Sequence, residues 1–496
     1  MRRSPFLKSC LVAATAAIAV GTLAAPAGAA VTLLAQGSLT GSSAGANTDL
    51  SGLTGTLENG VAANILGGLG SGLAYAGGNT FIAVPDRGPN ATAYNAAIDD
   101  TTSFISRLQT ITMALTPSTG GALPYSLTPT LTKTTLLSSA TPLVYGTGAG
   151  LGNRADGTPL GSGAPVQNTA STYYFTGRSD NFGPGNSGTP TDARFDPEAV
   201  RVSNDGASVF VSDEYGPYVR QFDRTTGTLI KTFTLPANLD VALLSPNGAT
   251  EISANLAGRT ANKGMEGLAI TPDGKTLVGI MQAALIQDAK ATPNLVRIVT
   301  IDIATGATHE YGYTLTTGSG VSEIVAISDH QFLVDERDGK GLGDGSNAKV
   351  KQFFTIDIAG ATDITALTGA AATAAAVPKS ATPFLDLVAA LGKAGLTPAQ
   401  IPSKIEGLAF GQDVMIAGVL THTLYVANDN DFVPATSGTN QFYVFGFQDG
   451  DLPGFTPQQF ASAVPEPATW AMMLAGFALI AASLRGRRHR AAPQTA

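Results

Sequence analysis

Acidic residues recur just before short apolar segments along this 496-residue chain. Glu266 and Glu406 stand in nearly identical phrases, Lys-Gly-Met-Glu-Gly-Leu-Ala-Ile and Lys-Ile-Glu-Gly-Leu-Ala-Phe. Glu198 and Glu323 head looser copies, and Ser71 stands at the equivalent point of a fifth copy. One such phrase carries no information, but several spread over one region indicate a repeat architecture.

A second group of acids follows each phrase at a regular distance. The separation is 15 residues from Ser71 to Asp86 and from Glu198 to Asp213, and 12 residues from Glu323 to Asp335. If each phrase begins one strand and the second acid ends the next, repeated units place both groups at one mouth of a shared channel. The expected ring comprises Asp86, Glu198, Asp213, Glu214, Glu266, Glu323, Asp335, Glu336, Glu406, Asn428, Asp429 and Asp431.

So many carboxylates in one funnel need cations to remain ionised, and ligands that are all oxygen suit Ca²⁺ better than Zn²⁺. The predicted catalytic residues, acting as bases or ligands, are Glu198, Glu266, Glu323 and Glu406. The predicted metal ligands are Asp86, Asp213, Glu214, Asp335, Glu336, Asp429 and Asp431. The predicted substrate-binding cations are Arg87, Lys263, Arg337 and Lys404. Any one of these acids could instead cap a turn.

The elements that must position these residues are short strands. Residues 198–235 contain four apolar runs separated by Asp-Gly and Thr-Gly turns, the pattern of one propeller blade. The Glu positions are 68, 57 and 83 residues apart, and the 127 residues from Ser71 to Glu198 make about two such steps. Residues 116–190 then hold a degenerate blade and a long loop. The prediction is an all-β, six-bladed β-propeller over residues 30–450, with a pair of β-sandwich domains as the alternative.

Two further elements complete the predicted fold. A strand near Val31 is expected to pair with the last blade and close the ring, which removes an exposed edge. A short helical insert is expected before the last blade, over residues 382–391 and 396–400, where the apolar residues have helical spacing.

The series of motifs resembles the family called "esterase-like activity of phytase" over roughly residues 50–450. The residues that carry the resemblance are Asp86-Arg87-Gly88, Asp196-Pro197-Glu198, Asp213-Glu214-Tyr215-Gly216, Met265-Glu266-Gly267-Leu268, Ser322-Glu323, Asp335-Glu336-Arg337-Asp338, Ile405-Glu406-Gly407-Leu408 and Asn428-Asp429-Asn430-Asp431. The resemblance implies a phytase-like propeller that hydrolyses phosphoric esters, with Ca²⁺ as its metal. Ser71 and the acid-free end of the third repeat, Met281-Gln282, depart from the pattern.

Both ends of the chain read as processing signals. Residues 1–29 have a basic start, an apolar run and Ala27-Gly28-Ala29, typical of a secretory signal peptide rather than a membrane anchor. Residues 464–490 combine Val-Pro-Glu-Pro, an apolar segment at 469–484 and an arginine cluster. This order resembles a PEP-CTERM sorting signal, which implies export, membrane retention through a transmembrane segment and cleavage by an exosortase; a plain C-terminal anchor is the alternative.

Composition narrows the function further. The only cysteine, Cys10, lies in the signal, so the mature protein has no disulfide and no cysteine-ligated metal. Without both signals the chain keeps 22 basic and 36 acidic residues, a net charge of −14 that disfavours nucleic acid. The four histidines show no metal-binding spacing, and no nucleophile elbow is convincing. A Ca²⁺-dependent hydrolase of phosphoric esters, localised to the envelope or exterior, is therefore expected, with a non-catalytic Ca²⁺-stabilised envelope or matrix protein as the alternative.

Overall fold

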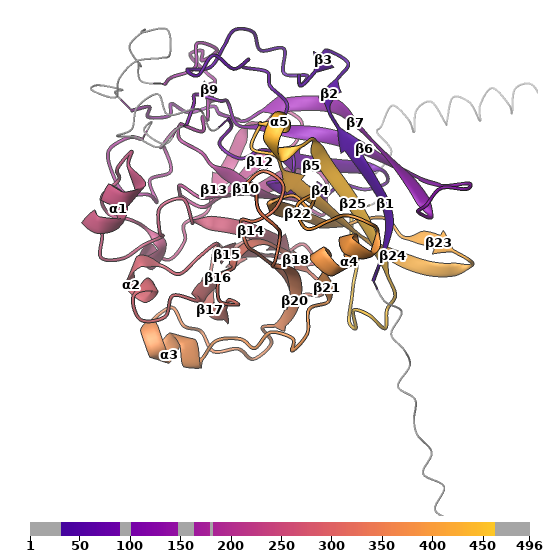
Figure 1. Cartoon of the computed structure of the whole chain (residues 1–496). Coiled ribbons are helices and arrows are strands. Elements are labelled where there is room, and N and C mark those ends of the chain that lie inside the picture. The colour runs from indigo at the N-terminus through magenta and orange to yellow at the C-terminus, as the bar shows by residue number, and fades with distance from the viewer. Residues whose placement is uncertain (1–30, 90–100, 147–162, 179–181, 462–496) are drawn as a thin grey trace, which may run out of the picture.

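The computed structural model describes residues 31–89, 101–146, 163–178 and 182–461 (Figure 1). The predicted signal peptide at 1–29 and the predicted sorting tail at 464–490, with its apolar segment at 469–484, lie outside the described residues. Within the described ranges, no helix is both long enough and apolar enough to cross a membrane.

The described residues form five antiparallel sheets around one axis, each with four strands that pair in order from the inside outward. Blade 1 contains β4 (Gly72–Tyr75), β5 (Thr80–Val84), β6 (Arg107–Pro117) and β7 (Tyr125–Leu136). Blade 2 contains β10 (Pro197–Val202), β11 (Ser208–Asp213), β12 (Val219–Asp223) and β13 (Leu229–Thr232). Blade 3 contains β14 (Met265–Ile270), β15 (Thr276–Met281), β16 (Leu295–Asp302) and β17 (Thr308–Thr314).

Blade 4 contains β18 (Gly320–Ala326), β19 (Gln331–Arg337), β20 (Lys351–Asp357) and β21 (Leu385–Asp386). Blade 5 contains β22 (Lys404–Phe410), β24 (Val419–Asp429), β25 (Asn440–Phe447) and β1 (Thr32–Leu39), and β23 (Val414–Ile416) pairs with β24 beside it. The innermost strands β4, β10, β14, β18 and β22 contact one another in that order, and β22 contacts β4 again. The sheets therefore close into a ring, and in Figure 1 the colour gradient runs round it.

The prediction of six blades is wrong, because the described residues form five. The error lies in the 127 residues between Ser71 and Glu198, a length that predicts two repeats. Part of this length forms the long outer strands β6 and β7 of blade 1, which have 11 and 12 residues. The described remainder holds only the two-stranded pair of β8 (Ser138–Ser139) and β9 (Tyr173–Tyr174). The all-β propeller itself is confirmed.

The predicted closure by the N-terminal strand is confirmed. Strand β1 pairs antiparallel with β25, from Thr32 opposite Gly446 to Leu39 opposite Asn440. Blade 5 is thus built from both ends of the folded region, and its outer edge is covered by the first strand of the chain.

Apolar side chains pack between blades rather than in one central core. Each pair of neighbouring blades shares a buried cluster: for blades 2 and 3, for example, Phe210 and Val219 pack with Leu268, Leu277 and Val299. Equivalent clusters lie between the other four pairs. Because every blade is stabilised by both neighbours, the ring and not the single blade is the unit that buries enough apolar surface to fold.

Asp-Gly turns join the two inner strands of blade 2, as predicted, and also those of blade 3. Gly206 and Gly274 adopt φ values of +71° and +73°, a region that other residues rarely adopt. The preceding aspartates accept hydrogen bonds from the backbone just beyond each turn, Asp205 from Ala207 at 2.9 Å and Asp273 from Lys275 at 3.0 Å. These turns lie at the end of the channel opposite the acids.

Helices are few and short in the described residues. Within the predicted helical insert the structure has α4 (Leu387–Lys393), and Asp386 caps α4 by accepting a hydrogen bond from Ala389 N at 2.9 Å. A further helix, α3 (Gly369–Ala374), precedes the predicted range. Residues 396–400 form turns instead of the predicted helix. The remaining helices are η1 (Ala237–Leu239), α1 (Gly248–Ala254), α2 (Ile286–Ala289) and α5 (Pro434–Ser437), and a small hairpin joins β2 (Gly41–Ser42) to β3 (Gly45–Ala46).

Residues 455–461, called the strap below, cross the turn end of the channel. Thr456 N donates to Ile327 O of blade 4 at 2.8 Å, and Gln458 Nε2 donates to Val202 O of blade 2 at 2.7 Å. Phe455 packs on Phe410 of blade 5, and Phe460 packs on Tyr75 of blade 1. Gln459 N reaches Pro272 O of blade 3. The strap thus contacts all five blades and covers a cavity of about 70 Å³ beneath it.

Candidate functional site

The end of the channel opposite the strap, called the acidic mouth below, gathers most of the predicted site residues. The inner strands begin there and the second strands end there, because each pair is antiparallel. Residues at the start of an inner strand and just past the end of its partner therefore face the same opening.

A β-bulge marks the start of the inner strand in blades 2 to 5. The pairing register shifts at Glu198, Glu266 and Glu406, and also in blade 4, between Val321 and Glu323. A bulge leaves one residue unpaired and re-aims its side chain. In blades 3 and 5 the bulged residue is the glutamate of the repeated phrase.

In blade 4 the bulged residue is Ser322 and not Glu323. Glu323 lies opposite Asp335, in the same register position as Gly267 opposite Ile280 in blade 3. The glutamate of this repeat is therefore displaced by one residue from its counterparts. Its Oε1 accepts hydrogen bonds from the backbone of Leu268 and Ile324, at 3.0 and 2.9 Å, and its Oε2 lies 2.8 Å from Nη2 of Arg201.

The residue that follows each second strand adds a further tier to the acidic mouth. Asp213 pairs with Pro197 and Asn428 pairs with Ile405, at the start of the inner strand in each case. The residues that follow Asp213 and Asn428 in sequence are Glu214 and Asp429, and they occupy this tier. By the same register, the equivalent residues are Asp86, Gln282 and Arg337. Three acids, one amide and one cation thus occupy this tier.

One group of carboxyl groups lies on blade 2. One oxygen each of Asp196, Glu198 and Glu214 lies within 4.8 Å of the others, and all three side chains are buried. Burial raises the pKa of Glu198 well above its usual value, and the charges of Glu266 and Asp196 raise it further. Burial likewise raises the pKa of Glu214, and Asp196 adds to the effect.

Two oxygen atoms in this region are buried without a hydrogen-bond donor, Oε1 of Glu214 and Oε2 of Glu266. Burial raises the pKa of Glu266 well above its usual value, and the charges of Glu214 and Glu406 act in the same direction. Buried carboxylates without donors are costly, so this side of the mouth needs protons or a bound cation.

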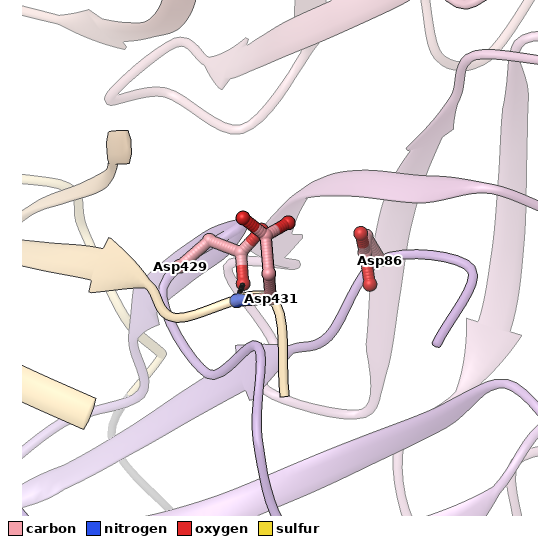
Figure 2. A group of neighbouring side chains, drawn as sticks. All are labelled: Asp86, Asp429 and Asp431. Atoms are coloured by element: carbon pink, nitrogen blue, oxygen red, sulfur yellow. Dashed lines mark hydrogen bonds between the residues drawn. The ribbon is translucent and has the colours of Figure 1, made fainter. Parts of the chain in front are cut away.

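A second group lies between blades 1 and 5. Figure 2 shows Asp429 and Asp431 side by side with Asp86 facing them, and the three offer oxygens within 4.8 Å of one another. Lys404 Nζ lies 3.0 Å from Asp429 Oδ2 and 2.5 Å from Asp431 Oδ1. This lysine already supplies the positive charge that the group needs. Burial and the charge of Asp429 still raise the pKa of Asp86 well above its usual value.

Arg337 stands where the other blades have an acid or an amide. Its Nη2 forms an ion pair with Glu406, its Nε donates to Ser322 Oγ at 2.5 Å, and Glu266 Oε1 lies 3.8 Å away. Burial raises the pKa of Glu406 to about 7, against the lowering effect of Arg337 and Lys404. Although burial opposes it, the charges of Glu406 and Glu266 raise the pKa of Arg337.

The other two predicted cations also lie at the mouth. Arg87 Nη1 lies 2.9 Å from Asp196 Oδ2. Lys263 is exposed, and its Nζ donates to Gln282 Oε1 at 2.9 Å. The next residue, Gly264, runs against blade 2 so closely that a Cβ there would lie 2.1 Å from Glu214 O. Glycine thus allows the loop that carries Lys263 to run close against the backbone of Glu214.

Three predicted metal ligands are placed away from the shared opening. Asp213 is buried in an ion pair with Arg220 and accepts the backbone N–H of Asp196 and Tyr215. Glu336 accepts hydrogen bonds from Tyr313 and Lys379 on the outer side of blade 4. Asp335 is buried below the mouth, and neither of its oxygens has a hydrogen-bond donor.

The structure also adds residues that the sequence reasoning did not select. Asp196 belongs to the first carboxyl group, Gln282 occupies the tier position of blade 3, and Ser322 is the bulged residue of blade 4. Asp196 stands in the Asp-Pro-Glu motif two residues before Glu198, and a count of all acids beside each repeated glutamate would have found it. The bulge that brings Ser322 to the mouth cannot be predicted from the residue types around it.

Comparison with known proteins identifies the family. The model of the family "Esterase-like activity of phytase" matches residues 64–432, and the PEP-CTERM protein-sorting motif matches residues 463–488. An uncharacterized secreted protein of Arthroderma benhamiae is 31% identical over 264 residues. The match covers 47% of this chain and 47% of that relative, so the chain spans about half of its length.

Solved structures match more distantly. Hydrazine synthase of Kuenenia stuttgartiensis is 12% identical with a TM-score of 0.28, over 78% of this chain and 82% of that one. A calcium-binding regucalcin of Agrobacterium tumefaciens is 13% identical with a TM-score of 0.23, over 54% and 80% of the two chains. The family match spans most of the propeller. The chain therefore belongs to the phytase-like family, and its sorting motif indicates an exported protein.

Proposed function

We propose that this exported member of the phytase-like family hydrolyses phosphoric esters at the acidic mouth with the help of Ca²⁺. The observation that carries the proposal is the blade 2 group of Asp196, Glu198 and Glu214 beside cationic side chains of the same opening. In such an opening the carboxylates can hold a metal ion, and the neighbouring cationic side chains can bind the negatively charged oxygens of a substrate.

The blade 2 group fits a hard divalent cation. Its ligands would be carboxylate oxygens of Asp196, Glu198 and Glu214, all of the type that Ca²⁺ prefers. The orphaned Oε1 of Glu214 is the observation that favours a cation over a purely structural group. When bound, such a cation neutralises phosphate charge and lowers the pKa of water. The group of Asp86, Asp429 and Asp431 is a poorer candidate, because Lys404 lies within it.

Lys263 is the cation best suited to receive a phosphoryl group. It is exposed and donates a hydrogen bond to the neutral amide of Gln282, whereas Arg337 and Lys404 are paired with carboxylates. Binding an anion at Lys263 therefore breaks no ion pair. Arg337 and Lys404 lie deeper and set the potential of the mouth.

Glu406 is the residue best suited to move a proton. A carboxyl group with a pKa of about 7 is half protonated near neutral pH and can donate to a leaving oxygen. Its ion pair with Arg337 orients the side chain. Glu266 lies next to the same arginine and shares the raised pKa.

The test is phosphate release by the purified chain from a panel of phosphomonoesters, with Ca²⁺ and with EDTA. We expect release only with Ca²⁺, and a loss of about 100-fold in Glu198→Gln, which removes one ligand charge. Asp329→Asn changes the same charge on an exposed turn far from the mouth and should keep full activity. No release from any ester under either condition would refute the proposal.

A second function is favoured by the ion pairs within the mouth. Arg337 of blade 4 pairs with Glu406 of blade 5, and Arg87 pairs with Asp196 beside blade 2. Lys404 pairs with Asp429 within blade 5. These pairs suit a non-catalytic propeller of the envelope or matrix in which Ca²⁺ only stabilises the ring. In that case EDTA lowers the melting temperature, while Glu266→Gln and Glu406→Gln leave every measured activity unchanged.

A further inference from the structure

The hairpin formed by β23 and the first residues of β24 is unusually apolar for an exposed element. Its residues 414–421 read Val-Met-Ile-Ala-Gly-Val-Leu-Thr and contain no charge, in a chain of otherwise acidic balance. Met415, Val419 and Leu420 are 58%, 53% and 52% exposed. Isolated exposed apolar residues are ordinary, but three on one projecting hairpin mark an interaction site.

The two faces of the hairpin differ. Val414 and Ile416 pack against the cluster between blades 1 and 5, which holds the hairpin in place. Met415 is paired with Leu420, and both side chains are exposed to solvent. Tyr125 of β7 donates to Met415 O at 2.9 Å and supports β23 from blade 1. The hairpin is therefore a supported element with a free apolar face.

The hairpin projects from the strap end of the ring. Strand β24 pairs with β22 from Asp429 at the acidic mouth to Leu424, and its first residues continue past the end of β22 (Figure 1). His422, at the base of the hairpin, packs on Phe455 of the strap with 4.9 Å between ring centroids. The hairpin and the strap thus lie at the same end, opposite the acids.

The chain leaves the described fold at this same end. The strap ends at Ala461, whose N donates to Asn204 O at 2.6 Å, and the sorting motif begins at residue 463. An apolar run, Trp470 to Leu484, follows within that motif. Nine extended residues reach at most about 32 Å, which limits the distance between Ala461 and the start of this run.

We propose that the apolar hairpin inserts into a lipid bilayer surface while the sorting tail is attached. The occupant is lipid because the hairpin is a projecting, uncharged finger beside the point where the chain passes into an apolar segment. The insertion is shallow, since an unpaired strand edge is not tolerated in the hydrocarbon core. The acidic mouth then faces away from the membrane, towards soluble substrates or partners.

The test uses the full chain with Cys10→Ser, which leaves no other thiol, and Met415→Cys labelled with an environment-sensitive fluorophore. Phosphatidylcholine vesicles without a quencher should raise the emission of this label. Vesicles that carry a quencher near the headgroup should then reduce it. A quencher deep in the acyl chains should act less. The matched control is a label at Lys340→Cys, exposed in the loop that follows Arg337 at the mouth, which should not respond.

Val419→Ser with Leu420→Ser, made in the same labelled chain, should abolish most of the quenching at position 415. Both side chains are exposed, so the fold is expected to survive, which circular dichroism checks. If the label at 415 stays in water while the chain floats with the vesicles, the tail alone binds lipid and the proposal is overturned. Concentration-dependent dimers without lipid, lost in the serine variant, would overturn it in favour of a second copy.

Discussion

The pH dependence of stability offers the sharpest test of the electrostatics at the acidic mouth, through Glu406→Gln. The Glu406 side chain is 5% exposed and its pKa is about 7, against an ordinary value of 4.5. Between these values the folded protein holds a proton that the unfolded chain has released. Stability from this group is therefore present below about pH 4.5 and is lost as the pH rises through 7.

The size of the effect follows from the two pKa values. Linkage of a single group with pKa 4.5 unfolded and about 7 folded predicts a loss of about 2.5 kcal/mol between pH 5 and pH 8. For a domain of this size that is about 3 °C in melting temperature. Glutamine cannot titrate, so the variant should lose less stability over this range. Glu266 acts in the same direction, because burial raises its pKa and the charges of Glu214 and Glu406 raise it further.

The assay is urea denaturation in EDTA at pH 5, 6, 7 and 8, so that no metal compensates for the carboxylates. The quantity compared is the slope of the free energy of unfolding against pH, not the free energy itself, because the variant also loses the ion pair with Arg337. Asp329→Asn, an exposed change of equal charge, should keep the slope of the unchanged protein. Equal slopes for the glutamine variant and the unchanged protein would show that Glu406 is ionised throughout, and would refute the reasoning.

Three further substitutions probe the surroundings of the site by urea denaturation. Arg220→Ala leaves Asp213 buried without its counterion and should cost about 3–5 kcal/mol; an unchanged midpoint would mean that Asp213 is neutral. Gly264→Ala places a Cβ 2.1 Å from Glu214 O and should cost at least about 1–3 kcal/mol; a neutral result would show that the loop moves freely. Phe455→Ala removes the strap's main aromatic contacts and should cost about 3 kcal/mol; full stability would mean that the strap does not hold the blades together.

Much of the fold could be predicted because local chemistry repeats. In blade 2 the Asp-Gly and Thr-Gly turns separate four runs that the structure shows as β10 to β13. The pairing of β1 with β25 followed from the need to cover an edge. The blade count failed because loop length carries no information on strand number, so the 127 residues before Glu198 could hold one blade or two.

The sequence predicts that the acids gather around one opening, but it does not predict which residues form ion pairs with one another. Residue type and spacing brought Glu198, Glu266 and Glu406 to one opening, as the bulges now show. The ion pair between Asp213 and Arg220 was not predictable, because Arg220 lies on a third strand whose register depends on tertiary pairing. Residue type aligns Glu323 with the other repeated glutamates, whereas the position of the bulge aligns Ser322 with them.

The displacement of Glu323 in blade 4 makes the distribution of charge around the acidic mouth uneven. With Ser322 in place of a glutamate and Arg337 in place of an acid, blade 4 contributes positive charge where blade 2 contributes three carboxyl groups. If the mouth acts as proposed, a cation held by the blade 2 group and Arg337 across the channel would attract the oxygens of a phosphoric ester from opposite sides and would orient it before any reaction. Arg337→Gln should therefore raise KM more than it lowers melting temperature if the mouth is catalytic, and should only lower melting temperature if it is structural.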